Sequence, residues 1–135
     1  EVEAGGGGRS VARRIYGTYP LKLVVPGGVG AGDKGAVVAY LVSYGGGLVS
    51  GDDLELAVDV DEGATAVLLT QASTKVFKRV EGRPPASQRL VARVAAGALL
   101  ASLPHVVTPF RGADYAQVQE VCIEEGGSCA LLDWL

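Results

Sequence analysis

Methionine is absent from the 135 residues, and the sequence holds one histidine and two cysteines. A single histidine leaves little material for an intrinsic metal site with several imidazole ligands. Two cysteines are too few for the disulfide framework of a small secreted domain, so we expect a reducing, cytoplasmic compartment. Because position 1 is not methionine and the sequence stops in the apolar run Leu131–Leu135, we expect a fragment of a longer protein.

Further absences exclude whole classes of partner. The net charge is −3, so the chain lacks the basic face of a nucleic-acid-binding protein. No uncharged apolar stretch approaches the roughly 20 residues of a membrane-spanning helix. The acidic, glycine-rich start does not read as a signal peptide. We therefore expect neither nucleic acid nor a membrane as a partner. The length and a hydrophobic fraction of 48% predict one globular domain.

Apolar residues alternate with polar ones along most of the chain. In Leu54–Val60 every second residue is apolar, which predicts a half-buried strand with an acidic outer face. That face is either solvated or a surface for a cation or a basic partner. Residues 89–94 and 115–123 alternate in the same way, and no window has helical spacing. We predict a mostly β fold with little or no helix, built of stacked antiparallel hairpins that form a sandwich-like or coiled-sheet scaffold.

Glycine-containing turns recur through the predicted sheet region. Gly63, Gly97 and Gly127 each stand between two apolar segments, a weak repeat of strand, turn and strand. Any ordinary β-meander would also show such hairpins. Residues 1–15 are predicted to be a flexible tail and residues 16–135 part of one β-rich domain, with a surface loop over 27–35. Gly30–Gly35 matches G-x-G-x-x-G, but a strand follows it, which argues against a dinucleotide site.

Candidate catalytic residues are few. A hydrolase could use Ser73 together with Lys75 or His105. The Ser-x-x-Lys pattern fails because position 72 is alanine, and His105 follows a proline in a predicted loop without a nucleophile elbow. Cys122 and Cys129 flank a predicted turn at 124–127. They could face each other across it, but a reducing compartment favours two free, packed thiols.

The glycine-rich stretch 45–52 is the most constrained part of the sequence. Successive glycines indicate either positive φ angles or very close backbone packing. Asp52 closes this stretch and has two possible roles. Its carboxylate could bond the backbone of its own turn, or it could face inward, in parity with Leu54, along a wet path that favours a divalent cation. The second role makes Asp52 a candidate metal residue.

Four ordered blocks resemble the urease accessory protein D family, called UreD or UreH. Residues 19–23 read Y-P-L-K-L, 44–52 read Y-G-G-G-L-V-S-G-D, 70–78 read T-Q-A-S-T-K-V-F-K, and Leu132–Trp134 read L-D-W. Ala72 stands where many relatives have glycine. The Thr-Ser-Gly-Arg run that usually follows the Asp-Trp pair is missing because the sequence ends there. The resemblance covers about residues 16–135 and identifies the N-terminal half of such a protein.

The resemblance implies a β scaffold without catalysis of its own and without a tightly bound cofactor. Such proteins bind apo-urease and, with accessory proteins F and G, the latter a GTPase, support nickel insertion into the urease active site. Nickel would then be a cargo in transit. The family-motif residues, which the resemblance makes possible partner contacts, are Tyr19, Pro20, Lys22, Tyr44, Gly46, Gly47, Gly51, Asp52, Gln71, Ser73, Thr74, Lys75 and Asp133.

Overall fold

The structure is a computed structural model that describes residues 1–26 and 35–135. The loop expected over residues 27–35 and the glycine pattern at Gly30–Gly35 lie outside the described residues, except for Gly35. Strands dominate the described part, with one short 3-10 turn, η1 (Tyr44–Gly46). The strands are β1 (Val2–Gly5), β2 (Arg9–Ala12), β3 (Leu21–Val24), β4 (Ala36–Ser43), β5 (Gly47–Leu48), β6 (Asp53–Val60), β7 (Thr65–Thr70), β8 (Thr74–Val76), β9 (Ala86–Val94), β10 (Leu99–Ser102), β11 (Val107–Pro109), β12 (Tyr115–Ile123) and β13 (Ser128–Leu131).

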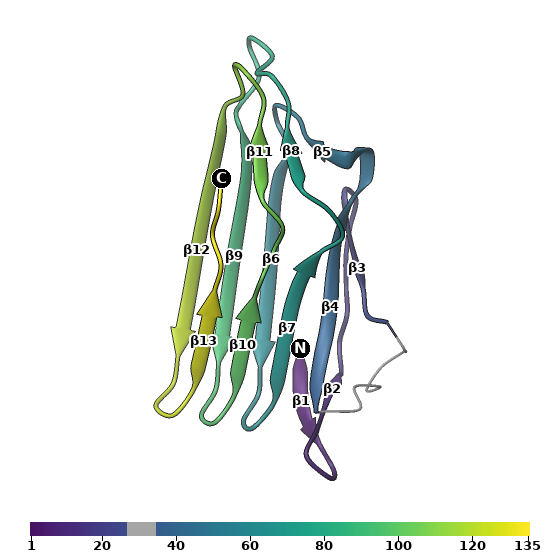
Figure 1. Ribbon diagram of the computed structural model, residues 1–135, viewed down its shortest axis with the longest axis vertical. Helices are drawn as coiled ribbons and strands as arrows, with labels where there is room; N and C mark the ends of the chain where they lie inside the picture. Colours follow the sequence, from purple (N-terminus) through teal and green to yellow (C-terminus); the bar gives the residue numbers. More distant parts are fainter. Residues whose placement is uncertain (27–34) are drawn as a thin grey trace.

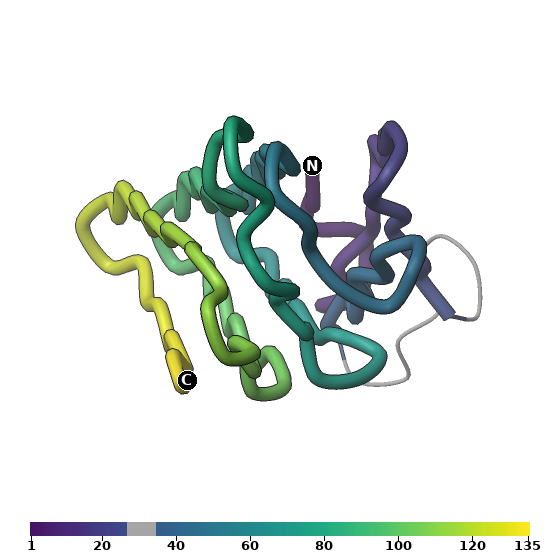
Figure 2. Tube along the Cα trace, turned by 90° about the horizontal axis from the view of Figure 1, so that it is seen from above, coloured from purple at the N-terminus to yellow at the C-terminus, as the bar shows by residue number. Residues whose placement is uncertain are grey.

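The strands wind into a coil with three sheets (Figure 1). The first sheet has the order β12-β9-β6-β1-β2, the second β13-β10-β7-β4-β3, and the third β11-β8-β5. One turn of the coil contributes β6, β7 and β8, and the next contributes β9, β10 and β11. Figure 2 shows successive turns side by side in chain order. The prediction of a mostly β fold is confirmed, and the coiled-sheet version of it is the one found.

The predicted antiparallel hairpins are wrong for the body of the coil. The strands β6, β9 and β12 pair in parallel, as do β4, β7, β10 and β13, whereas β1–β2 and β3–β4 are antiparallel. Each glycine turn joins two strands of different sheets, and each strand pairs with its equivalent one turn further on. Alternation of polar and apolar residues is the same in both arrangements, so the sequence pattern could not distinguish them.

The glycine turns stack as the suspected repeat requires. The amide of Gly63 donates to the carbonyl of Ala96, and the amide of Gly97 donates to the carbonyl of Gly126, both at 3.2 Å. Gly63, Gly97 and Gly126 have φ angles of 68°, 67° and 82°. These left-handed angles favour glycine over residues with a Cβ. The repeat is therefore a property of the coil, one turn of structure for each unit of sequence.

The expected flexible tail over residues 1–15 is instead largely a hairpin. The strands β1 and β2 pair with each other, Val2 pairs with Val60 of β6, and Val2 and Ala12 are buried in the core. The amide of Thr65 also donates to the Ser10 hydroxyl at 2.8 Å. The run of glycines suggested a tail, but it forms the turn of this hairpin, with apolar residues on both sides of it.

The acidic outer face of β6 is confirmed, and the neighbouring strand β9 carries arginines that bind acidic side chains. Arg93 on β9 contacts Asp59 at 3.3 Å and Asp61 at 2.8 Å on one side and Glu124 at 3.3 Å on the other. Arg89 binds Glu120 on β12 at 2.8 Å. The strand β9, which carries both arginines, lies between the acidic strands β6 and β12. Its positive charges neutralise much of the acidic outer face. The pKa values of both guanidinium groups are raised by these carboxylates, first through hydrogen bonds.

Two apolar clusters fill the interior of the coil. The larger includes the fully buried side chains of Val60, Val94 and Leu100, and the smaller contains Leu48, Leu54, Val76, Ala86 and Val107. No helix in the described ranges has the length and apolar character needed to cross a bilayer.

Candidate functional site

Three of the four family blocks meet at one groove of about 330 Å³. The block at residues 19–23 leads into β3, which pairs with β4, and β4 pairs in parallel with β7. The block at 44–52 follows β4, and the block at 70–78 follows β7. We call this the motif groove. Its lining residues are Leu21, Leu41, Val42, Ser43, Gly46, Leu48, Leu54, Thr70, Gln71, Ala72, Ser73, Thr74, Lys75 and Gln88.

The first two family blocks each begin with an exposed tyrosine, and the two tyrosines are in contact. The rings of Tyr19 and Tyr44 stack with centroids 5.8 Å apart, and the amide of Tyr44 donates to the carbonyl of Pro20 at 3.0 Å. Tyr19 is 82% exposed and Tyr44 54%. Lys22 lies opposite Val42 in the β3–β4 pair and is exposed. The first two family blocks therefore bring their exposed aromatic side chains together.

The successive glycines combine both of the expected causes. Gly45 and Gly46 have φ angles of 80° and 72°. Gly47 is extended and packs against β8, where an added Cβ would lie 2.5 Å from the carbonyl oxygen of Lys75 and 2.8 Å from Cε2 of Phe77. Gly47 pairs with Lys75 in the third sheet. A side chain at position 47 would thus separate the second and third family blocks.

Asp52 binds the backbone of its own turn. Its Oδ2 accepts a hydrogen bond from the amide of Val49 at 2.9 Å, and its amide donates to the carbonyl of Val49 at 3.0 Å. Gly51 supplies a φ of 91° for this turn. The strand β6 begins at Asp53, so the inward parity expected for Asp52 does not extend to it. A role for Asp52 in a cation path stays a prediction.

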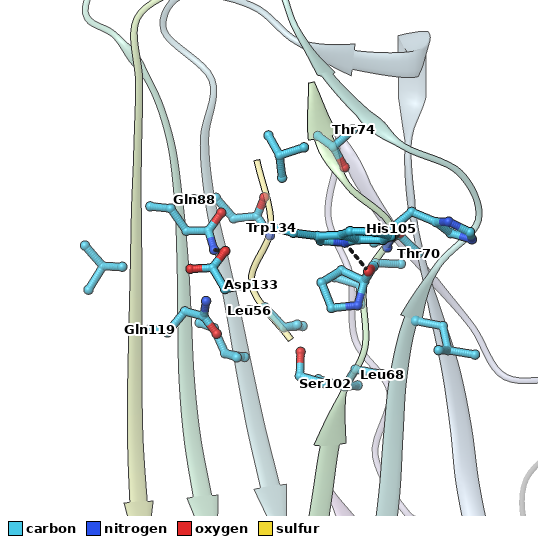
Figure 3. A pocket seen from close by; sticks show the side chains of 17 residues that line it. Leu56, Leu68, Thr70, Thr74, Gln88, Ser102, His105, Gln119, Asp133 and Trp134 are labelled. Atoms are coloured by element: carbon cyan, nitrogen blue, oxygen red, sulfur yellow. Dashed lines mark hydrogen bonds between the residues drawn. The ribbon is translucent and has the colours of Figure 1, made fainter. Parts of the chain in front are cut away.

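Polar side chains line a small cavity that residues of both apolar clusters also border (Figure 3). We call them the polar layer; all are half-buried except the exposed Asp133, and they are Thr70, Thr74, Gln88, Ser102, Gln117, Gln119 and Asp133. They line a cavity of about 50 Å³ together with His105 and Trp134. Thr70, Thr74 and Gln88 also line the motif groove, so the groove and this interior cavity share a wall.

Hydrogen bonds connect the polar layer to the last family block. The Gln117 amide donates to Asp133 Oδ1 at 3.1 Å, and the Tyr115 hydroxyl donates to Gln117 Oε1 at 2.8 Å. Burial, assisted by the charge of Asp133, raises the pKa of Tyr115 to about 12. The Trp134 indole donates to the carbonyl of Pro104 at 3.0 Å. The exposed Asp133 thus contributes a carboxylate to the wall of the cavity, while Trp134 binds the loop after β10.

The hydrolase arrangement is not assembled. Within residues 1–26 and 35–135, no hydrogen bond joins the Ser73 hydroxyl to Lys75 or to His105. His105 is exposed, and its backbone amide donates to the Thr70 hydroxyl at 2.8 Å. A serine nucleophile needs a base within hydrogen-bond reach. The geometry therefore gives the hydrolase interpretation no support.

The two cysteines are free thiols on different faces of the coil. Cys122 is exposed on β12, whereas Cys129 on β13 is partly buried against the larger apolar cluster. Burial raises the pKa of the Cys129 thiol. The expectation that they face each other across a hairpin is wrong, because their turn joins strands of two different sheets.

Sequence reasoning missed Gln88, Tyr115 and Gln117. A signal was available, since Gln88 has the same parity in β9 as the buried Leu90, and polar residues rarely occupy such inward positions. The strand register then places Gln117 beside Gln88. Leu54, Gln88 and Gln117 are equivalent positions on three adjacent parallel strands, so the two amides lie side by side.

Comparison with known proteins identifies similar sequences. The family model described as UreD urease accessory protein matches residues 2–135. Urease accessory protein D of rice (Oryza sativa subsp. indica) is 42% identical over 94% of this chain and 41% of its own length. The Arabidopsis thaliana protein of the same name is 39% identical over 96% and 44%, and UreD of Anaeromyxobacter is 44% identical over 95% and 41%. The chain spans about two fifths of the length of these relatives.

Proposed function

The chain belongs to the UreD family of urease accessory proteins, and on that premise we propose that it binds apo-urease and, with accessory proteins F and G, supports nickel insertion into the urease active site. It acts in the cytoplasm as a non-catalytic scaffold. It holds no tightly bound cofactor, and nickel is its cargo. The relatives that support this proposal are named as accessory proteins rather than as enzymes.

One observation carries the proposal beyond the family name: the polar layer lines a cavity that members of both apolar clusters also border. Its amides and hydroxyls are half-buried, and the exposed Asp133 carboxylate joins them through its hydrogen bond with Gln117. Gln88, Gln117 and Asp133 offer oxygen atoms, and His105 stands at the wall of the same cavity. Such a mixture of weak ligands suits a divalent cation that must leave again.

The motif groove supplies the surface for partners. Tyrosine is enriched at protein interfaces because one end is apolar and the other polar. Gln71, Ser73 and Lys75 line it, and the stacked Tyr19 and Tyr44 are exposed at the start of the two blocks that contribute further lining residues. Lys22 is exposed on β3. We assign partner contact to this surface and passage of nickel to the polar layer behind it.

The test separates assembly from nickel transfer. Gln119→Leu replaces an amide of the polar layer that does not line the motif groove by an apolar group, whereas Gln119→Glu keeps an oxygen acceptor at the same place. Each variant is co-expressed with apo-urease and accessory proteins F and G. We expect Gln119→Leu to lower nickel per urease active site severalfold at unchanged pull-down yield, and Gln119→Glu to retain nickel loading. Equal nickel content in both variants would remove the polar layer from the mechanism.

A matched experiment addresses the hydrolase alternative. Ser73→Ala removes the hydroxyl that a hydrolase would need as its nucleophile. We expect no turnover of model esters by the unmodified protein or by the variant. If the unmodified protein hydrolyses esters and Ser73→Ala abolishes this activity, the hydrolase hypothesis would be supported instead.

A further inference from the structure

The strand β6 has a free edge along most of its length. On one side it pairs with β9 over Asp53–Val60, but on the other side β1 meets it at Val60 (Figure 1). The amide of Ser87 donates to the carbonyl of Asp52, and that of Ala95 to the carbonyl of Val60. Backbone groups alternate in direction along a strand, so those of Asp53, Glu55 and Ala57 point away from β9. Among the described residues, none pairs with them.

A groove of about 400 Å³ runs beside this edge. Its walls are largely apolar and include Leu54 and Leu56 of β6, Leu21 of β3 and Ile15 of the segment that precedes β3. Ile15 remains 43% exposed. The combination of unpaired backbone donors and acceptors with an adjacent apolar groove is the surface on which peptides add as an extra strand.

The charges around this groove favour a basic occupant. Glu1, Asp53, Glu55 and Asp59 line it, against the single basic residue Arg14. Asp59 already binds Arg93, whereas Glu55 has no ion pair among the described residues. A strand added here would place its outward side chains next to Asp53 and Glu55, where opposite charges stabilise cross-strand pairs.

A second copy of this chain fits the edge poorly. Its net charge is −3, and its own edge strand β12 carries Glu120 with Glu124 following, both exposed. Like charges directly opposite each other destabilise a strand pair. The acidic edge therefore points to a different polypeptide.

We propose that the free edge of β6 is a docking site for an extended segment of a partner polypeptide. The segment adds a strand to the first sheet and alternates apolar side chains, which enter the groove, with basic side chains, which lie beside Asp53 and Glu55. The proposal concerns β6 and does not depend on nickel transfer through the polar layer.

The direct test uses a fluorescent synthetic heptapeptide that alternates lysine with valine, measured by anisotropy against the whole chain. We expect saturable binding that weakens in high salt, and new hydrogen-exchange protection at the amides of Asp53, Glu55 and Ala57. A peptide of the same composition with its lysines grouped together should not bind. A peptide N-methylated at alternate residues tests the backbone pairing without altering the protein, and its unimpaired binding would overturn the proposal.

Protein variants test the charge argument. Glu55→Lys should weaken binding about fivefold, because it replaces a favourable cross-strand pair by a repulsive one. Glu62→Lys makes the same change in an exposed turn outside the groove and should leave affinity unchanged. Equal weakening by both variants would mean general electrostatic attraction. Two further outcomes would overturn the proposal. In one, the heptapeptide binds only when it is covalently fused to the chain at Glu1. In the other, the chain associates with itself and does not bind the peptide.

Discussion

Gly47→Ala tests the packing that unites the second and third family blocks. The added Cβ would lie 2.5 Å from the Lys75 carbonyl oxygen, a backbone atom that cannot rotate away. Overpacking of this kind costs about 1–3 kcal/mol. Displacement of β5 would also expose part of Leu48, which is 1% exposed and contributes up to about 2 kcal/mol. We expect a loss of about 3 kcal/mol in the free energy of unfolding.

Urea unfolding followed by circular dichroism measures this loss, and two other glycines calibrate it. Gly45 has open space around its hypothetical Cβ but a φ of +80°, so Gly45→Ala should cost about 1 kcal/mol. Gly6 has open space and no positive φ, so Gly6→Ala should change stability by less than about 0.5 kcal/mol. Equal stability of Gly47→Ala and Gly6→Ala would refute the steric clash expected between a Cβ at position 47 and the Lys75 carbonyl.

Three further changes have defined outcomes. The pKa of Tyr115 in the folded protein, about 12, exceeds the usual value near 10. The contribution of the protonated Tyr115 to the free energy of unfolding should therefore be complete below pH 10 and be lost as the pH rises toward 12. Urea titrations should show that Tyr115→Phe removes this pH-dependent loss of stability. Thiol titration should find Cys122 reacting faster than Cys129, and the double change to serine should keep urease activation within a few fold. Asp52→Asn retains an acceptor for the Val49 amide, so normal nickel content in this variant beside a destabilised Asp52→Ala would confine Asp52 to its turn.

The class of fold was predictable because polar and apolar residues alternate along long strands such as β6 and β12. Leu54–Val60 shows it clearly, and the structure places its apolar residues inside the coil. Pairing partners were not predictable, because period-two patterning is equally compatible with a hairpin and with a parallel coil. The spacing of Gly63, Gly97 and Gly126 held the missing information. A repeat of similar length around a turn residue is what a solenoid requires, whereas a meander needs no fixed period.

The family blocks located most of the candidate site without any geometry. They did not reveal that residues 19–23, 44–52 and 70–78 share one groove, since that proximity comes from winding the chain around the coil. Asp133 shows the same limitation. It belongs to the last block in sequence, yet it binds Gln117 at the cavity wall through a hydrogen bond that depends on the β12 register.

The acidic stripe of β6 shows how register changes the meaning of a pattern. In sequence, Glu55 and Asp59 are equivalent members of one outward face. In the coil, Asp59 lies opposite Arg93 and binds it, while Arg89, opposite Glu55, binds Glu120 on the far strand. The carboxylate left without an ion pair is therefore the one beside the unpaired backbone edge. A carboxylate without an ion pair and backbone amides and carbonyls without hydrogen-bond partners thus lie at the same place among the described residues. A single basic, extended ligand would pair with both.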